Sequence, residues 1–347
     1  MYAPLQILSA YSLLKNPNTI PQIVATAKAR HYEAIALTDL NVMYGAVEFY
    51  RTALANDLKP LFGVTLEVNG LVNTATTFPM ILIAETQVGY QNLMWLSSAK
   101  MTAKTPDLTL TAIADHLAGL NVILPGDSEL SQFIASAYDD VAQYWQTLTT
   151  YVDPSHLYLG INPQMAPQIQ TRLAAFQALT QAQLIALDDV AYLNADDAFT
   201  TQVLKSIDAN VKLEGLKALS QQSGTQILQD FNQIKAAYQT SDLLKAAFLA
   251  NEALVARSQV TLTFSQTAAL PAFQLPAGMP DSGAYLKTLA EQGLVARLRG
   301  QHGDHSRYQA RLAQELAIID QLGFNDYFLI VWDIVNFAYQ NHIQLGA

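Results

Sequence analysis

The chain contains no cysteine, and it has few basic residues. Without thiols it can form neither a disulfide framework nor a thiolate zinc site. Its 19 lysines and arginines stand against 29 aspartates and glutamates, which gives a formal net charge of −10. So acidic a balance repels phosphate backbones and argues against a free-standing nucleic-acid binder, although a net charge does not exclude a local basic patch.

The sequence also lacks a secretory signal and a run that could span a bilayer. No basic segment followed by an apolar core stands at its start. The most hydrophobic late run, residues 327–339, is interrupted by Asp333 and Asn336 and is too short to cross a membrane. We therefore expect a cytoplasmic protein with no membrane partner. Its 347 residues, 51% of them hydrophobic, are enough for two domains with a sizeable core.

Short apolar runs alternate with helical patterns through the first two hundred residues. The runs are LQI at 5–7, AIALTD, KPLFGVTLEV, MILIAE, NVILPG, LYLGIN and QLIALDD. Strands separated by helices predict parallel β/α units, arranged as an open sheet or a barrel. Asp39 and Asp189 each follow such a run, and the carboxyl ends of the strands are where a β/α barrel holds ligands.

Beyond about residue 198 the strand signal fades. The segments 201–213 and 241–258 have apolar residues at helical spacing, and the prolines and glycines of 267–283 predict a linker. Helices are predicted at 284–299 and 308–322, separated by the polar loop GQHGDHS. For the aromatic residues of 325–339 we expect core packing rather than base stacking, because their flanks are acidic.

Several blocks, taken together, resemble the alpha subunit family of bacterial DNA polymerase III. They occur in the family's order and cover essentially the whole chain. The blocks are LQILSAYSLLKN (5–16), ALTDLNVMYGAVEFYRTALANDLKPLFG (36–63), VGYQNLMWLSS (88–98), LDDVAYLNADDA (187–198) and ELAIIDQLGFNDYFLIVWDIVNFA (315–338). The N-terminal domain of that family is of the polymerase and histidinol phosphatase (PHP) type.

This resemblance implies an α/β fold, a distorted β/α barrel of PHP type, followed by a mainly helical extension and the beginning of a polymerase palm. The domains it implies are a degenerate PHP barrel at 1–205, a helical extension at 206–268, and a linker with the N-terminal part of the palm at 269–347. The chain ends at QLGA, straight after a hydrophobic segment that something must cover. We expect a fragment or a truncated reading frame.

Metal-binding PHP domains hold clustered divalent ions with imidazoles and carboxylates, and the cations activate water and neutralise phosphate oxygens. Of the family's ligand positions, the resemblance finds only Asp39 and Asp189 retained. The lost positions are Gln6, Leu8, Lys15, Leu40, Thr65, Pro79 and Ala191. No histidine of the chain falls on a ligand position; the six are His31, His116, His156, His302, His305 and His342.

We therefore expect no metal and no other cofactor in this segment. Lys15 is hypothesised to neutralise Asp39 or Asp189 in place of a cation, because a buried unpaired carboxylate is costly. The alternative for each aspartate is a strand-end residue that caps the following turn. His302 and His305 are interpreted as solvated loop residues.

Three functions remain open. The first is the N-terminal part of a replicative DNA-directed DNA polymerase, with a metal-free PHP scaffold and no catalytic or nucleotide-binding residue in this segment. The resemblance implies Mg²⁺, primer–template DNA and deoxynucleoside triphosphates for the full protein. It also implies the parent's palm and thumb, a sliding clamp and other replisome proteins as partners. The second is a metal-dependent PHP phosphoesterase or 3′–5′ exonuclease, and the third is a purely structural docking module.

Overall fold

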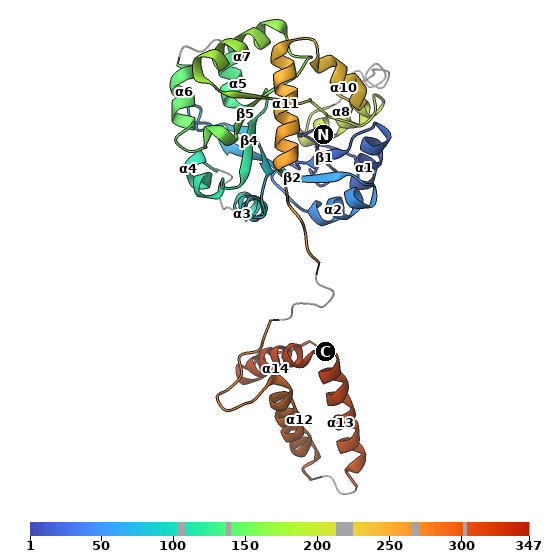
Figure 1. Ribbon diagram of the computed structural model, residues 1–347. Coiled ribbons are helices and arrows are strands. Elements are labelled where there is room, and N and C mark those ends of the chain that lie inside the picture. Colours follow the sequence, from blue (N-terminus) through green and yellow to red (C-terminus); the bar gives the residue numbers. More distant parts are fainter. Residues whose placement is uncertain (103–107, 137–139, 213–224, 265–270, 301–303, 347) are drawn as a thin grey trace. The chain divides into compact units, whose positions relative to one another are not determined.

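The computed structural model describes residues 1–102, 108–136, 140–212, 225–264, 271–300 and 304–346. It divides into two compact units, Met1–Leu262 and Thr263–Ala347, which are described separately (Figure 1). The division falls inside the predicted helical extension 206–268. The predicted boundaries at 205/206 and 268/269 themselves stay predictions.

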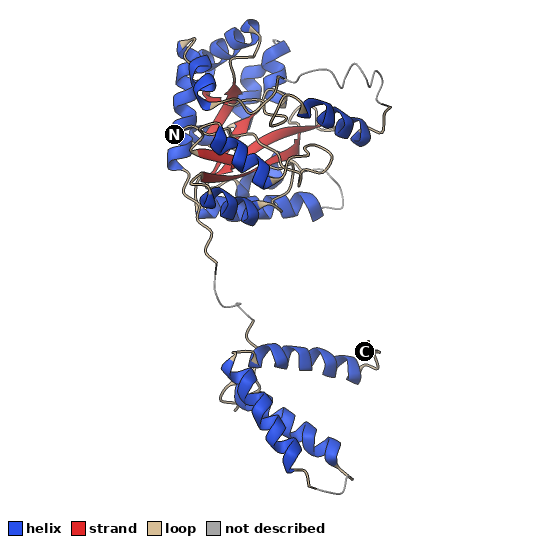
Figure 2. Ribbon diagram, turned by 90° about the vertical axis from the view of Figure 1, so that its right-hand side faces the viewer, coloured by secondary structure: helices blue, strands red, loops and turns tan. Residues whose placement is uncertain are grey.

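The first unit is built on a six-stranded sheet with the strand order β1-β2-β3-β4-β5-β6. The strands are β1 (Ala34–Leu37), β2 (Lys59–Asn69), β3 (Thr77–Ala84), β4 (Leu120–Leu124), β5 (Leu157–Ile161) and β6 (Gln183–Ala186). Helices lie along the outside of the curled sheet (Figure 2). The predicted mixed α/β architecture of barrel type is confirmed.

The prediction of parallel units throughout is wrong in the middle of the sheet. The pairs β1–β2, β4–β5 and β5–β6 are parallel, whereas β3 is antiparallel to both β2 and β4. Only residues 70–76 connect β2 to β3. A parallel crossover needs a dozen residues or more, so a connection this short can only turn the chain back on itself.

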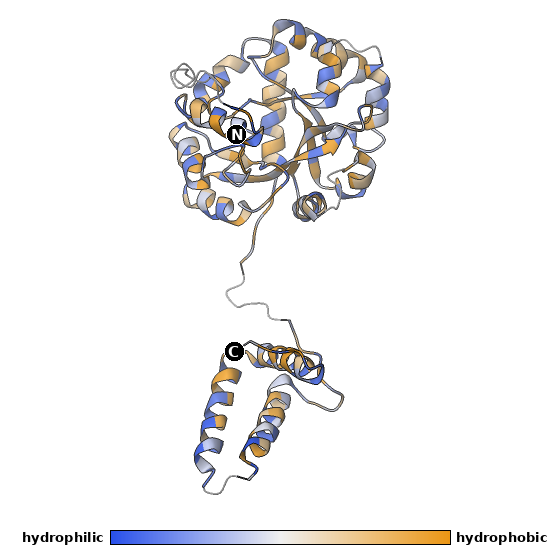
Figure 3. Ribbon diagram, turned by 180° about the vertical axis from the view of Figure 1, so that it is seen from behind, coloured by the Kyte–Doolittle hydropathy of each residue, from blue (hydrophilic) through white to orange (hydrophobic). Residues whose placement is uncertain are grey.

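Both faces of the sheet are buried, and side chains alternate between them along each strand. Ile35 and Leu37 of β1 pack with the outer helices, while Ala34 and Ala36 belong to a separate inner cluster. Other members of the inner cluster are Leu61, Ile81, Ile83, Ile123, Tyr158, Ile185, Leu187, Leu254 and Val255. The strands accordingly colour as mostly hydrophobic in Figure 3.

The opening segment runs beside β1 without forming a regular strand. Ala36 donates its N–H to the Pro4 carbonyl (3.2 Å), and Thr38 donates to the Ile7 carbonyl (2.8 Å). The strand predicted through Ile7 is therefore present only as an irregular extended edge. Pro4 has no N–H with which to continue a ladder.

Helices and short 3-10 turns complete the first unit. The α-helices on the outer side or between strands are α1 (Ile20–Ala29), α2 (Ala46–Ala55), α3 (Gln87–Thr102), α4 (Leu110–Ile113), α5 (Glu129–Ser136), α6 (Val141–Leu148), α7 (Pro167–Thr180), α8 (Asp197–Asp208) and α10 (Phe231–Tyr238); the 3-10 turns are η1 (Ala114–His116) and η2 (Pro154–His156). The helix α11 (Asp242–Arg257) packs against β6, and Leu254 and Val255 join the inner cluster. The predicted helix 201–213 ends earlier, at Asp208, because Asn210 takes a positive φ of 52°.

The second unit contains the helices α12 (Ser282–Leu298), α13 (Ser306–Gln321) and α14 (Asn325–Gln340). The Asp326 carboxylate accepts the Phe273 N–H (2.8 Å) and the Ser282 hydroxyl (3.2 Å), which ties the preceding loop to α14. No helix among the described residues is long and apolar enough to span a membrane.

The aromatic run at 327–339 does not form the predicted core. It lies on α14, where Leu329 and Ala338 are the buried residues, whereas Phe337 is 60% exposed and Tyr339 82% exposed. Much of α14 therefore presents apolar surface, visible as a largely orange helix in Figure 3. A three-helix unit offers too few facing side chains to bury every side of a helix that is apolar nearly all round.

Candidate functional site

Asp39 follows β1 and is buried, with 1% of its surface exposed. It accepts hydrogen bonds from the Ser9 N–H (2.6 Å), the Ser9 hydroxyl (2.7 Å) and the Ser12 hydroxyl (2.6 Å). Burial raises the pKa of Asp39, and the hydrogen bonds from Ser12 and Ser9 oppose that rise. The polar bend of the opening segment thus satisfies this carboxylate with protein donors, so no cation is needed to compensate it.

Leu40 and Thr65, two of the lost positions, are held in the backbone frame around Asp39. The Leu40 N–H donates to the Ser12 hydroxyl (2.9 Å), and the Thr65 N–H donates to the Asp39 carbonyl (3.1 Å). The Thr65 hydroxyl donates to the Thr38 carbonyl (2.9 Å), so its proton is already engaged. These residues lock β1 to β2 at the end where the family would hold a metal.

The hypothesis that Lys15 neutralises Asp39 or Asp189 is wrong, because Lys15 pairs with another carboxylate. Its ammonium lies 2.6 Å from a carboxylate oxygen of Asp208, at the end of α8, and both side chains are about 40% exposed. With Ser9 and Ser12 already donating to Asp39, an ammonium there would have to lose its hydration for little gain. Lys15 therefore stays in an exposed pair that spans from the opening loop to α8.

A cavity of about 620 Å³ opens where β4, β5 and β6 end. Its polar lining includes Gln6, Asp127, Asn162, Asp188 and Asp189. The structure thus brings Gln6 and Asp189, two of the predicted positions, to one cavity, at the strand ends where the barrel pattern predicts a site. Asp39 does not line it.

Asp188, which was not predicted, is the buried carboxylate of this cavity. The Tyr2 hydroxyl donates to its Oδ2, and the Tyr238 hydroxyl donates to its Oδ1 at 3.0 Å. Burial raises the pKa of Asp188 to about 6, and the two tyrosine hydrogen bonds oppose that rise. The aspartate pair after β6 is the sequence signal for this residue. Successive side chains of an extended segment point in opposite directions, so one of two adjacent aspartates is expected to point inward.

Asp189 also lines the cavity but is exposed. Its carboxylate accepts a hydrogen bond from the Gln226 side chain, and the Gln226 carbonyl accepts the Ala191 N–H (2.9 Å). Asp127 stands across the cavity, where burial and then the charge of Asp189 raise its pKa. The carboxylates gathered here repel anions, so the lining is unsuited to a phosphate group.

Pro79 and Glu67 lie opposite each other in the β2–β3 ladder. Proline has no side-chain donor atom for a metal. Glu67, which lies two residues from Thr65, was not predicted as a candidate. Its carboxylate is engaged by the Asn41 amide at 3.0 Å.

The described histidines make contacts away from the expected metal-ligand positions. His31 pairs with Asp230 (2.7 Å), and the His116 ring stacks on Trp95 with 3.5 Å between ring centroids. His156 lies at the opposite end of the strands, while His305 directly precedes α13 and His342 follows α14. His302 lies outside the described residues. In the described part of the chain, no three His, Cys, Asp or Glu side chains gather closely enough to hold a metal ion.

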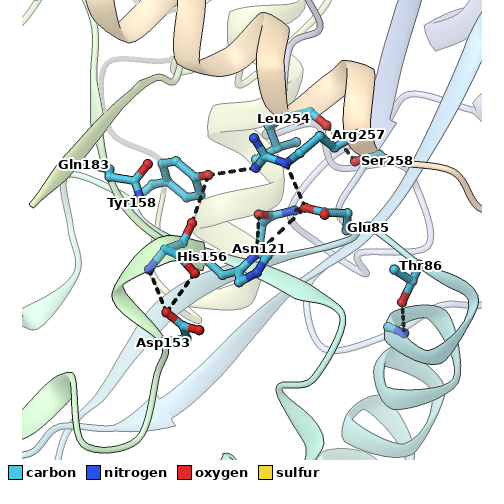
Figure 4. Close-up of polar contacts among 12 residues, drawn as sticks. Glu85, Thr86, Asn121, Asp153, His156, Tyr158, Gln183, Leu254, Arg257 and Ser258 are labelled. Carbon is cyan, nitrogen blue, oxygen red and sulfur yellow. Dashed lines mark hydrogen bonds and ion pairs between the residues drawn. The ribbon is translucent and has the colours of Figure 1, made fainter.

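At the amino ends of β4 and β5 lies a second polar cluster (Figure 4). Glu85 accepts hydrogen bonds from Asn121 (3.0 Å) and from Arg257 at the end of α11 (3.3 Å), while Arg257 also donates to the Tyr158 hydroxyl (2.9 Å). His156 lies 3.2 Å from the Asn121 amide oxygen. This network fastens the end of α11 to the barrel.

The comparisons with known proteins agree with this architecture. Residues 4–164 match the family described as "PHP domain", which fits the distorted barrel of PHP type seen in the first unit. Residues 284–347 match the family described as "Bacterial DNA polymerase III alpha NTPase domain". Over essentially its whole length the chain is similar to curated proteins named DNA polymerase III subunit alpha.

Two curated relatives illustrate this relationship. The chain is 28% identical over 351 residues to "DNA polymerase III subunit alpha" of Bacillus subtilis (strain 168), covering 99% of the chain and 30% of the relative. It is 29% identical over 346 residues to the protein of the same name from Streptococcus pyogenes, covering 100% and 29%. The chain thus spans about 30% of the length of the curated relatives it matches. The resemblance predicted from the sequence blocks is confirmed.

Among solved structures, an amidohydrolase from Chromobacterium violaceum aligns with a TM-score of 0.37 and 12% identity. The alignment covers 55% of this chain and 88% of that one. A likeness at this level supports no functional argument.

Proposed function

We propose that the chain is the N-terminal part of a cytoplasmic, replicative DNA-directed DNA polymerase, and that its PHP domain is a metal-free, non-catalytic scaffold. The name shared by its relatives supports the first half of this proposal. In the full protein, Mg²⁺, primer–template DNA and deoxynucleoside triphosphates serve the polymerisation reaction. The palm and thumb, a sliding clamp and other replisome proteins are its partners. No catalytic residue is assigned to this segment.

The second half of the proposal rests on one observation, the donor set at the carboxyl end of the strands. The residues at the lost positions offer aliphatic side chains, one amide, one hydroxyl and one ammonium in place of imidazoles and carboxylates. A cluster of divalent ions needs several anionic or imidazole ligands. The residues present do not fit such a cluster.

The two retained aspartates are also engaged by the protein itself. Asp39 accepts from Ser9 and Ser12, and Asp189 accepts from Gln226. A domain whose carboxylates are satisfied internally keeps its stability without a metal, since unpaired buried charges are what destabilise a fold. Such a domain is suited to serve as a rigid body for the rest of the polymerase.

The test measures metal binding and hydrolysis by the purified 347-residue chain. After dialysis against a chelator, titration with Mn²⁺ or Zn²⁺ followed by calorimetry is expected to give no stoichiometric binding. The chain is likewise expected to release no nucleotides from a single-stranded primer in the presence of either metal ion. Binding of two or more ions per chain, or metal-dependent nucleotide release that disappears in the Asp39→Asn/Asp189→Asn variant, would refute the scaffold and favour the exonuclease.

The polymerase half is tested separately. The gene product isolated from its native source is expected to be longer than this chain and to extend a primed template with Mg²⁺. A native product that ends at Ala347 and forms no complex with a polymerase would refute this half of the proposal.

A further inference from the structure

Arginine is concentrated at one place in an acidic chain. Of eight arginines, four lie between residues 297 and 311, where Asp304 is the only acidic residue. We name Arg297, Arg299, Arg307 and Arg311 the arginine tip. Arg297 and Arg299 lie at the end of α12, and Arg307 and Arg311 lie in the first two turns of α13. The end of α12 and the start of α13 are neighbours in Figures 1 and 2.

The acidic groups nearby leave the charges of Arg299 and Arg307 without a carboxylate partner in the described part of the chain. Asp304 accepts the Ser306 N–H and the Ser306 hydroxyl, both at 2.8 Å, and so serves the start of α13. Arg311 pairs with Glu315 at 2.7 Å, one turn further along the same helix. Arg299 and Arg307 are exposed, and no carboxylate of the described residues lies within ion-pair distance of either.

The charges of α13 run against its helix dipole. The amino end of a helix carries partial positive charge, which favours carboxylates there and disfavours cations. In α13 the first turn holds Arg307 and no acidic residue, whereas the last turn holds Asp320 and no basic residue. Arg297 in the last turn of α12 is explained by that helix's own dipole, but Arg307 is not.

An exposed aromatic residue lies in the same stretch of α13 as two of these arginines. Tyr308 lies between Arg307 and Arg311 in the sequence and is 53% exposed. Nucleic-acid strands are bound by basic groups along the backbone together with aromatic faces on which bases stack. Arginine suits this role because its planar fork matches the oxygens of a phosphate.

We propose that the arginine tip binds the sugar–phosphate backbone of single-stranded DNA next to a primer–template junction, with Tyr308 stacking on a base. The inference rests on the proposed polymerase function, from which the DNA partner follows. An acidic protein surface would use the same charges, and the experiment below distinguishes it from DNA. The net charge of −10 confines such binding to this local patch.

The experiment measures the binding of a fluorescein-labelled primer–template, with a single-stranded overhang, to the full 347-residue chain by fluorescence anisotropy. At about 50 mM NaCl, Arg299→Ala/Arg307→Ala is expected to weaken binding about tenfold and to lower the salt slope by about 2. Tyr308→Ala is expected to weaken binding several-fold, while Tyr308→Phe retains it. Circular dichroism confirms that each variant is folded.

A matched control removes the same charge elsewhere. Lys28→Ala/Arg51→Ala changes two exposed basic residues of the first unit and is expected to leave DNA binding within twofold of the parent chain. Equal binding by the arginine variant and the parent chain overturns the proposal. So does a tip that binds poly-glutamate but no oligonucleotide, which would assign it to an acidic protein partner.

The outcome is separable from the tests of the proposed function. If the barrel is metal-free and belongs to an active polymerase, but the arginine tip does not bind DNA, only the present inference is rejected. Arginine-dependent DNA binding by a chain that also holds a metal cluster rejects only the scaffold.

Discussion

The Asn251 side chain binds both backbone groups of Ala3. Its Oδ1 accepts the Ala3 N–H at 3.1 Å, and its Nδ2 donates to the Ala3 carbonyl at 2.9 Å. The same Nδ2 donates to the Ala186 carbonyl at the end of β6 (3.1 Å). One buried amide therefore takes the place of strand pairing between the irregular opening edge and β6, and closes the barrel at the point where its ladder is missing.

Asn251→Leu is expected to destabilise the first unit by about 3 kcal/mol. The substitution leaves the N–H and carbonyl of Ala3 and the Ala186 carbonyl buried without their partner, and each such group costs about 1–3 kcal/mol. Urea unfolding followed by circular dichroism measures the loss.

Asn232→Leu is the matched control for this change, because Asn232 is exposed on α10. It is expected to change the free energy of unfolding by less than about 0.5 kcal/mol. Equal effects of the two substitutions would show that the Asn251 amide does not close the barrel.

The stability of the chain is expected to depend on pH through Asp188. Its pKa is about 6 in the folded state and 3.8 ordinarily, so the folded chain binds the proton more tightly than the unfolded chain does. This contribution is therefore largest at low pH and is lost as pH rises from about 4 through about 6. Relative to Asp188→Asn, the wild type is expected to lose at most about 3 kcal/mol over this range.

Asp189→Asn provides the comparison, since Asp189 is exposed and lies next in the chain. Denaturant unfolding at pH 4, 5, 6 and 7 is measured for the three proteins. A difference between wild type and Asp188→Asn that stays constant over this range would contradict the role assigned to the buried carboxylate.

Ser12→Ala is expected to destabilise the first unit by about 2 kcal/mol, because its hydroxyl donates to a buried carboxylate and accepts the Leu40 N–H. Hydrogen bonds to charged groups contribute about 1.5–3 kcal/mol. A double-mutant cycle with Asp39→Asn measures the coupling, which is expected to be clearly non-additive. Ser98→Ala, an exposed serine that bonds to the Met94 carbonyl, is the control. Additive effects at Ser12 and Asp39 would argue against the contact.

Lys15→Met is expected to change the free energy of unfolding by less than about 1 kcal/mol, because an exposed ion pair contributes little. The effect is expected to shrink further when salt is added. A loss of several kcal/mol, independent of salt, would instead place this ammonium against a buried carboxylate, as first hypothesised. Thermal unfolding at two salt concentrations decides between the two outcomes.

Much of the barrel could be predicted from local pattern. The runs AIAL, NVIL and LYLGI are strands because continuous apolar stretches of that length form strands buried on both faces. Strand direction was not readable from β2 and β3 themselves. It depends on the short connection of residues 70–76, which forces the chain to turn back on itself.

The candidate site was predicted less well, for a physical reason. Asp39 and Asp189 were found as strand-end carboxylates, but their partners come from distant segments. Ser9 precedes Asp39 by 30 positions and Gln226 follows Asp189 by 37, and no spacing rule links such residues. Lys15 was assigned by charge alone, although neutral hydroxyl groups can satisfy a buried carboxylate equally well.

The amide that closes the barrel also sets when the domain can be completed during synthesis. Ala3 and Asn251 are 248 positions apart, so the opening edge, which bonds β1 on one side, has no link toward β6 until α11 has left the ribosome. Contacts this distant in sequence form late and slow the folding rate. Until then the nascent chain exposes an unpaired sheet edge, which is a template for aggregation. The first unit is therefore expected to close its barrel only after its last helix has been released, rather than step by step during translation.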